Sequence, residues 1–158
     1  MKKLFVCLLA LLLLVGCGEK STNEEVDLNK VAETLLENVE TPMYEVTAID
    51  EESFPYFTFV DFKDGYQAVT ADALIGSIAH SVVVISTKDG DGATLANEVF
   101  ENANPQKWVC VSAAKTAVMY TDNLVVLVMS QVDTVDAIKA NFETNYKDGK
   151  VLEKTNAE

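Results

Sequence analysis

Apolar residues recur along this chain at two different spacings, and each spacing predicts a different kind of element. Leu28, Val31 and Leu35 fall at every third or fourth position, which is the spacing of one face of a helix. Asp27, immediately before them, is a residue type that caps helix N-termini well. The same spacing returns twice further along the chain, so the pattern predicts three amphipathic helices, at residues 28–39, 93–103 and 134–146.

Strand patterns fill much of the remaining sequence. Residues 44–49 alternate between apolar and polar, whereas 81–87 (SVVVIST) and 125–129 (VVLVM) are apolar throughout, as expected of strands buried on both faces. A polar turn, Thr121-Asp122-Asn123, joins two strand-like segments into a hairpin. The predicted strands are residues 44–49, 81–87, 116–120 and 124–130.

The order of these elements predicts the fold class. Hairpin and helix signals mix without the regular βαβ alternation of a parallel sheet, which favours an α+β fold. We expect an antiparallel sheet of four to five strands, covered on one face by about three helices. Residues 27–146 should form this single domain and residues 147–158 a disordered tail. The segment 53–80 leaves the choice between strand and helix open.

The N-terminus has the pattern of a secretory signal. Lys2 and Lys3 precede twelve consecutive apolar residues at 4–15, a helix of roughly 18 Å that is too short for a hydrocarbon layer of about 30 Å. Leu14-Val15-Gly16-Cys17 follows and resembles the lipobox of bacterial lipoproteins. The resemblance implies a signal peptide at 1–16, cleavage before Cys17 and a diacylglyceryl group on its thiol. An ordinary secretory signal that ends in Gly-Cys is the alternative.

Charge narrows the possible partners. The formal net charge is −13, every basic residue is lysine, and loss of Lys2 and Lys3 would leave 10 lysines against 25 carboxylates, about −15. So acidic a surface repels phosphate backbones, and the lack of arginine removes the fork that recognises them, so we expect no nucleic-acid partner. It repels anionic lipid as well, so the membrane contact should come through acyl chains on Cys17, with the polar residues 17–26 as a tether.

Cysteine usage excludes an internal disulfide in the processed chain. Cys7 leaves with the signal and Cys17 is the predicted anchor, so Cys110 has no partner. The apolar neighbours Trp108, Val109 and Val111 predict a buried, inert thiol.

Three longer stretches carry a second resemblance. The lipobox, tether and first amphipathic helix are followed by AHSVVVISTKDGDGATLANEVF and then by NLVVLVMSQVDTVDAIKANF. Together, over roughly residues 27–146, they resemble an uncharacterised domain family found in lipoproteins of Gram-positive bacteria. That family implies no activity and no catalytic residues, so only the lipid-anchoring role of Cys17 is carried over.

Catalytic and metal motifs are weak. Ser112-Ala113-Ala114-Lys115 matches Ser-x-x-Lys, but it runs into a predicted strand rather than lying on the helix that this chemistry requires. Asp89-Gly90-Asp91-Gly92 does not continue with the oxygen ligands of a calcium loop and is better explained as a turn before a helix. His80 is the only histidine, so we expect neither a metal nor a cofactor.

The acid-rich segment 50–72 is the one candidate for a binding surface. If its aromatic residues stay exposed, they would mark a site for a ligand or partner; otherwise they fill the core. The candidates are Phe54, Tyr56, Phe57 and Phe59.

These observations favour a lipid-anchored module on the extracytoplasmic face of the cell membrane, without enzymatic activity, that binds an envelope protein or a wall component. The alternative is an extracytoplasmic hydrolase that uses carboxylates. A cleft joining two carboxylates with unequal, raised pKa values would favour the hydrolase.

Overall fold

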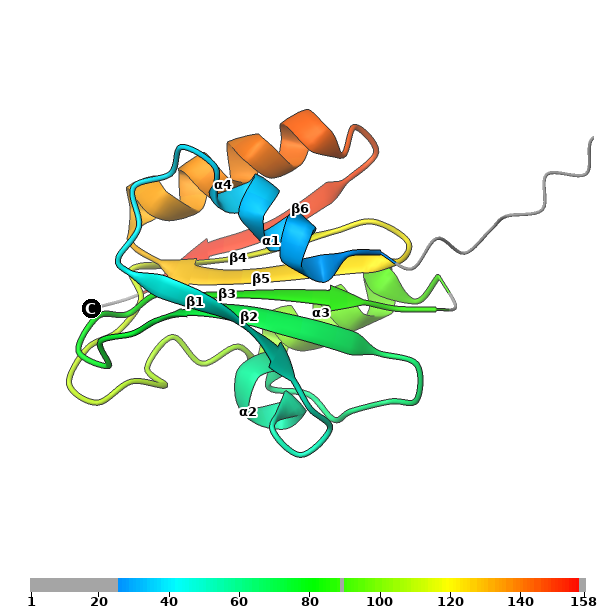
Figure 1. Ribbon diagram of the computed structural model, residues 1–158, viewed down its shortest axis with the longest axis horizontal. Helices are drawn as coiled ribbons and strands as arrows, with labels where there is room; N and C mark the ends of the chain where they lie inside the picture. Colours follow the sequence, from blue (N-terminus) through cyan, green and yellow to red (C-terminus); the bar gives the residue numbers. More distant parts are fainter. Residues whose placement is uncertain (1–25, 89, 157–158) are drawn as a thin grey trace, which may run out of the picture.

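The computed structural model describes residues 26–88 and 90–156, which form a six-stranded antiparallel sheet with four helices. The α+β class with an antiparallel sheet is thus as predicted, with slightly more strands. The strand order is β1-β2-β3-β5-β4-β6, and all five pairings are antiparallel (Figure 1). The strands are β1 (Tyr44–Ile49), β2 (Gln67–Ala73), β3 (Ser81–Ser86), β4 (Lys115–Tyr120), β5 (Leu124–Ser130) and β6 (Lys150–Thr155).

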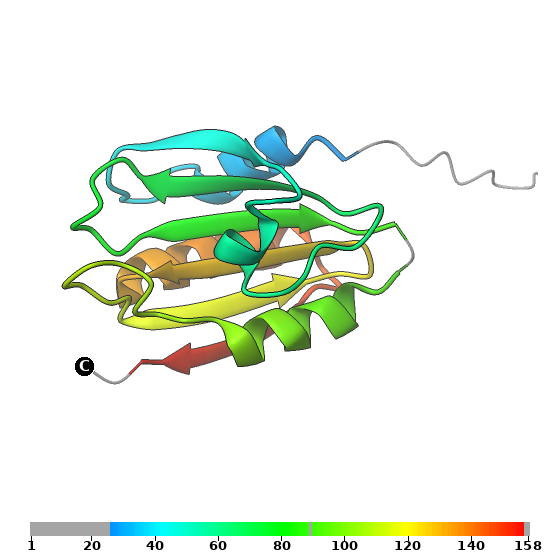
Figure 2. The ribbon, with the colours of Figure 1, turned by 90° about the horizontal axis from the view of Figure 1, so that it is seen from below.

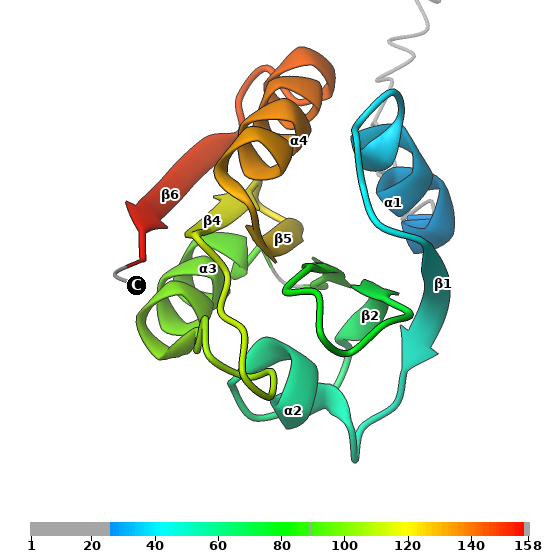
Figure 3. The same ribbon diagram turned by 90° about the vertical axis from the view of Figure 1, so that its left-hand side faces the viewer.

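The helices cover both faces of the sheet, so the expectation that they cover one face is wrong. Helices α1 (Leu28–Leu36) and α4 (Val132–Asn145) lie on one face, and α2 (Phe54–Thr58) and α3 (Gly92–Asn102) lie on the other (Figures 2 and 3). The cause is visible in β3 and β5. Val82, opposite Val128, faces α1 and α4, whereas Val83, opposite Leu127, faces α2 and α3. Strands that are apolar on both faces need a helical layer on each side.

The segment 53–80, which the sequence left open, contains one helix and one strand. Residues 54–58 form the short helix α2, with Pro55 in its first turn and Phe59 in the left-handed conformation (φ 64°) at its end. Proline suits a first helical turn because its missing N–H has no partner there in any case. Residues 67–73 form β2 between β1 and β3.

The C-terminal segment is a strand and not the disordered tail that we expected. Residues 150–155 form β6, which pairs along its whole length with β4. Val151 packs against the core below α1 and α4, and Leu152 packs against the core on the other face. The segment looks polar in sequence because an edge strand buries little of its surface.

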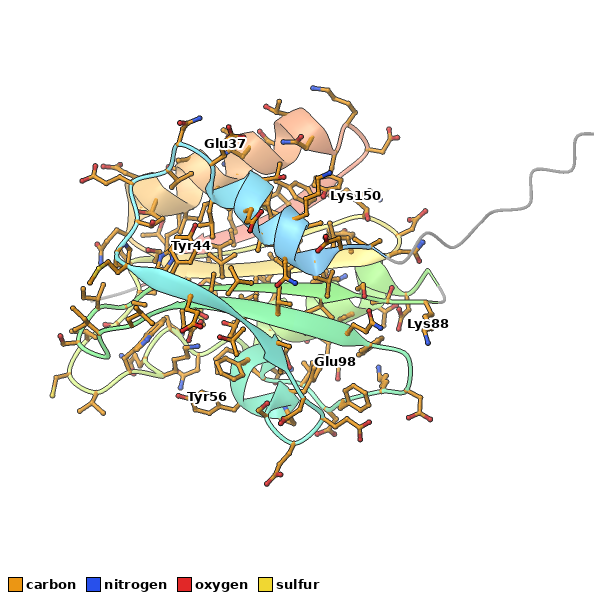
Figure 4. All side chains as sticks on the ribbon, in the orientation of Figure 1. Glu37, Tyr44, Tyr56, Lys88, Glu98 and Lys150 are labelled. Atoms are coloured by element: carbon orange, nitrogen blue, oxygen red, sulfur yellow. The ribbon has the colours of Figure 1, made fainter. Side chains whose placement is uncertain are left out.

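The described chain enters at one end of the sheet, and three connections lie at the opposite end. The described chain begins at Val26, which lies beside Ile49 and Asp50, where β1 ends. Met43 precedes β1, and the β2–β3 connection of residues 74–80 and the α3–β4 connection of residues 103–114 lie at that same, opposite end (Figure 1). Tyr44 and Lys88 mark these two ends in Figure 4.

Candidate binding surface

Large apolar side chains gather in solvent at the end of the sheet remote from Val26. We call this surface the distal end and define it by Met43, Leu74, Ile75, Ile78 and Val109, with Met43 72% and Val109 81% exposed. Exposed apolar residues that occur singly are normal, but a group of them marks an interaction surface.

The two connections that carry Leu74, Ile75, Ile78 and Val109 have almost no charge of their own. Residues 73–80 (ALIGSIAH) contain no acidic or basic residue other than His80, and residues 103–114 contain only Lys107. In a chain of net charge −13, these two connections therefore add little electrostatic repulsion against a partner.

The backbone holds the 74–80 connection in a defined shape. The Leu74 N–H donates to the Met43 carbonyl at 2.9 Å, and the Ile78 N–H donates to the Ile75 carbonyl at 3.0 Å. The His80 N–H then donates to the Ile78 carbonyl at 3.1 Å. These backbone bonds fix the course of the connection, while the side chains of Leu74, Ile75 and Ile78 remain exposed.

A buried lysine ties the second connection, 103–114, to the sheet. The Lys107 side chain is only 5% exposed, and its Nζ donates to Asp72 Oδ2 and to Ser81 Oγ, each at 3.0 Å. Asp72 Oδ1 also accepts the hydroxyl groups of Thr70 and Ser81, both at 2.6 Å. The cluster joins β2, β3 and the loop that carries Val109.

Three aromatic rings surround the same ammonium group. Lys107 Nζ lies 5.7 Å from the ring centroid of Tyr56, 5.3 Å from Phe57 and 5.1 Å from Trp108. The negative faces of such rings stabilise a cation at these distances. The aromatic residues of α2 therefore bind a lysine of their own chain.

The Ser81–Lys107 contact does not form a nucleophile–base pair. An amine that is to take the serine proton must accept the hydrogen bond from the hydroxyl group, whereas Lys107 Nζ donates to Ser81 Oγ and to Asp72 Oδ2. The Ser81 hydroxyl is fully buried and already donates to Asp72. The role of this cluster is to hold the loop of residues 103–114 to the sheet.

The four aromatic candidates divide between core and surface. Phe54 is 1% exposed and packs edge-on against Phe62 with ring centroids 5.5 Å apart, so it is a core residue. Tyr56, labelled in Figure 4, is 62% exposed. Phe57 is half-buried beside it, and both rings lie next to Lys107. Phe59 is half-buried against the α2–α3 core.

Cys110 is exposed, so the prediction of a buried thiol is wrong. It lies at φ 67°, in the left-handed region, next to the exposed Val109. The apolar neighbours that predicted a buried thiol belong to a loop, and in this loop Cys110 is exposed.

His80 is fully buried just behind the distal end. Its Nδ1 lies 3.0 Å from Ser130 Oγ, and its Nε2 has no hydrogen-bond partner. Burial lowers the pKa of the imidazole below its ordinary value, and the charge of Asp72 opposes that shift only in part. The neutral ring is a core residue and not a ligand for metal.

The Ser-x-x-Lys motif has no free amine. The Lys115 Nζ lies 2.6 Å from Asp136 and 2.9 Å from Glu153, and the hydrogen bonds to these two carboxylates raise the pKa of Lys115. Lys115 stands on β4 and Ser112 on the preceding loop, so the helical arrangement that acyl transfer requires is not formed.

A general acid needs a carboxyl group whose pKa is raised, whereas the two carboxyl groups with shifted pKa values have them lowered. Hydrogen bonds from Ser53 lower the pKa of Asp50, and those from Lys115 and Lys139 lower the pKa of Glu153. Within residues 26–88 and 90–156, no group of three or more His, Cys, Asp or Glu side chains could hold a metal ion.

The structure describes residues 90–92 of the Asp89–Gly92 motif. Asp91 precedes α3 and accepts the hydroxyl group of Tyr66, and the Gly92 N–H donates to the Asp122 carbonyl at 2.9 Å. A Cβ on Gly92 would stand 2.2 Å from the Thr121 carbonyl oxygen, so glycine is needed for this close approach. This accounts for a turn and a helix start rather than a calcium loop.

A groove of about 660 Å³ lies at the other end of the sheet, near Val26. Apolar and acidic residues both line it. The residues around it include Val26, Asp27, Ile49, Asp50, Glu51 and Phe62.

Comparison with family models, curated proteins and solved structures found no match. Within the described part of the chain, no helix has the length and hydropathy needed to cross a membrane. Cys17 and the rest of the predicted signal and tether lie outside the described residues, apart from Val26.

Proposed function

We propose that this chain is a lipid-anchored protein of the extracytoplasmic face of the cell membrane that binds an envelope partner through its distal end. The anchor is the diacylated thiol of Cys17, and the support for it is the lipobox-like Leu14-Val15-Gly16-Cys17 after a charged and apolar signal. Two acyl chains suffice for stable anchoring, so no membrane span is needed.

The observation that carries the binding role is the position of the distal end. The chain enters the domain at Val26, beside the C-terminal end of β1, whereas Met43 and the other distal-end residues lie beyond the start of β1. A strand of six residues spans about 20 Å. In a protein tethered through residues 17–26, the exposed apolar surface therefore faces away from the entry point of the tether and can meet a protein or a wall component.

A binding role is better supported than the carboxylate-dependent hydrolase. The hydrolase needs a carboxyl group whose pKa is raised, and the shifted carboxyl groups, Asp50 and Glu153, have lowered pKa values. In the contact between Ser81 and Lys107 the amine donates to the hydroxyl oxygen and the hydroxyl group donates to Asp72, so the two residues are not arranged as nucleophile and base. A finding of hydrolytic activity that depends on an acidic residue would favour the alternative.

Site-specific photo-crosslinking in cells tests this function. A benzophenone amino acid in place of Val109 should give a discrete adduct, and the same probe in place of the exposed Thr144 on α4 is the matched control. Leu74→Asp, a charge in the middle of the distal end, should abolish the Val109 adduct without affecting processing. Equal labelling at positions 109 and 144, or an adduct that survives Leu74→Asp, would contradict the proposal.

A further inference from the structure

The two edge strands of the sheet are protected to different degrees. The edge strand β6 (KVLEKT) carries Lys150, Glu153 and Lys154, and charges of this kind discourage pairing with another chain. The other edge, β1 (YEVTAI), has six residues with a single charge, Glu45, and neither lysine nor proline. Among the described residues β1 pairs with β2 alone.

The register shows which backbone groups of β1 point away from the sheet. The Leu74 N–H donates to the Met43 carbonyl, so this facing pair is a hydrogen-bonded one. Hydrogen-bonded and non-bonded pairs alternate along an antiparallel ladder, so Glu45, Thr47 and Ile49 direct their backbone groups to β2. Tyr44, Val46 and Ala48 therefore direct one N–H and one C=O each to the outer edge.

Helix α1 packs over β2 and β3 rather than past β1, and Figure 3 shows β1 at the border of the sheet. Apolar surface adjoins both ends of this edge. Met43 lies at its start, and the groove lined by Ala48 and Ile49 lies at its end. An added strand would find main-chain partners along β1 and apolar contacts at both ends.

The flanking charges determine what kind of strand fits. Glu40 precedes β1, Glu45 lies within it, and Asp50, Glu51 and Glu52 follow it. We propose that the outer edge of β1 binds an extended peptide segment of the partner, apolar over about six residues and flanked by lysine or arginine, as a seventh strand. This inference rests on the proposed function, whose partner it describes. A second copy of the chain fits poorly, because antiparallel pairing of β1 with its own copy brings residues 50–52 of one molecule toward Glu40 of the other.

Peptide titration of the processed lipoprotein in detergent micelles tests the inference directly. The probe is the peptide Lys-Lys-Val-Ile-Val-Ile-Val-Ile-Lys-Lys, followed through the backbone amide signals of the labelled protein. We expect the largest shifts at the amides of Tyr44, Val46 and Ala48. One matched probe carries glutamate in place of all four lysines, and the other carries N-methyl groups on all the central residues, which removes the donors of whichever set faces β1.

Variants at one position separate the backbone effect from side-chain effects. Proline is tolerated on an edge strand where its nitrogen faces outward, so Ala48→Pro should fold and bind the lysine-flanked peptide about tenfold more weakly or not at all. Ala48→Thr keeps the N–H and should bind like the parent. Dispersed amide signals show that each variant is folded, and the N-methylated peptide tests the same point on the unaltered protein.

Equal affinity for the N-methylated and parent peptides would overturn strand addition. Equal affinity for the glutamate-flanked and lysine-flanked peptides would overturn the inferred preference for basic flanking residues. Dimerisation that Ala48→Pro abolishes would show that the occupant is a second copy. If the crosslink at position 109 persists in Ala48→Pro, the proposed function stands and this inference fails. If that crosslink never forms, the proposed function fails, whatever the peptide does.

Discussion

Replacing either partner of the Lys107–Asp72 ion pair should show how firmly the loop of residues 103–114 is held to the sheet. Asp72→Asn leaves the Lys107 ammonium group without its counter-charge in a site where the side chain is 5% exposed. Lys107→Met leaves the Asp72 carboxylate, which is 25% exposed and still accepts the hydroxyl groups of Thr70 and Ser81. Asp72→Asn therefore leaves the more deeply buried of the two charges unpaired.

The expected magnitudes follow from this difference in burial. Removing one partner of a buried pair costs about 3–5 kcal/mol, and the partial exposure of Asp72 places this pair at the lower end. We expect a loss of about 3 kcal/mol in the free energy of unfolding for Asp72→Asn. For Lys107→Met we expect about 2 kcal/mol, because methionine still packs well against the three aromatic rings. The double variant should lose about 3 kcal/mol, less than the two single losses together, because neither charge remains unpaired.

Urea denaturation followed by fluorescence of Trp108, which contacts Lys107, measures all four proteins. The midpoint for Asp72→Asn should fall by about 1–2 M urea, given typical denaturant slopes. Additive losses in the double variant, or a Lys107→Met variant less stable than Asp72→Asn, would refute the reasoning.

The other predictions concern one residue or a matched pair each. Because the pKa of His80 is lowered from 6.5 in the folded protein, the unfolded chain takes up the proton first as the pH falls. The free energy of unfolding should therefore decrease below about pH 6.5 and stay level above pH 7.5. In urea titrations at fixed pH, His80→Gln should flatten this pH dependence between pH 7.5 and 5.5. Phe54→Ala should lower the free energy of unfolding by about 3–5 kcal/mol, whereas Tyr56→Ala, at an exposed ring, should lower it by about 1 kcal/mol or less. Equal losses of stability in thermal melts would contradict the different burial of the two rings. Cys110 should react with iodoacetamide in the folded protein at nearly the rate of the unfolded chain, and Cys110→Gly should stabilise by up to about 1 kcal/mol because its φ is 67°; a slow reaction would show that the thiol is covered.

The central part of the fold was predictable because its residues follow the spacing of their elements. Strand β1 has the predicted bounds, and the continuous apolar runs of β3 and β5 correctly indicated central strands. The same runs also required helices on both faces, and that consequence was missed. Successive residues of a strand, such as Val82 and Val83, point to opposite faces of the sheet, so one layer of helices cannot cover both.

The remaining elements depend on tertiary contacts that local sequence does not show. Helix α2 has five residues and three of them are aromatic, so its composition resembles a strand; burial of Phe54 against Phe62 decides the outcome. Strand β6 is mostly polar, and its pairing with β4 and the packing of Val151 and Leu152 against the two cores make it a strand.

The candidate surface was only partly predictable for the same reason. The aromatic segment drew attention to Tyr56 and Phe57, which do lie beside Lys107. Lys107 meets Asp72 and Ser81 from 35 and 26 residues away, and no spacing rule predicts such a contact. The exposed Leu74 and Ile75 look like core residues until the loop that carries them is seen.

The central claim is that Cys17 anchors the protein to the membrane, and incorporation of labelled palmitate in a Gram-positive host tests it most directly. The parent chain and Cys110→Ala should both incorporate label and run at the size of the processed form. Cys17→Ala should remain an uncleaved, unlabelled precursor. Incorporation of palmitate by Cys17→Ala, or processing of that variant to the mature size without lipid, would contradict the account.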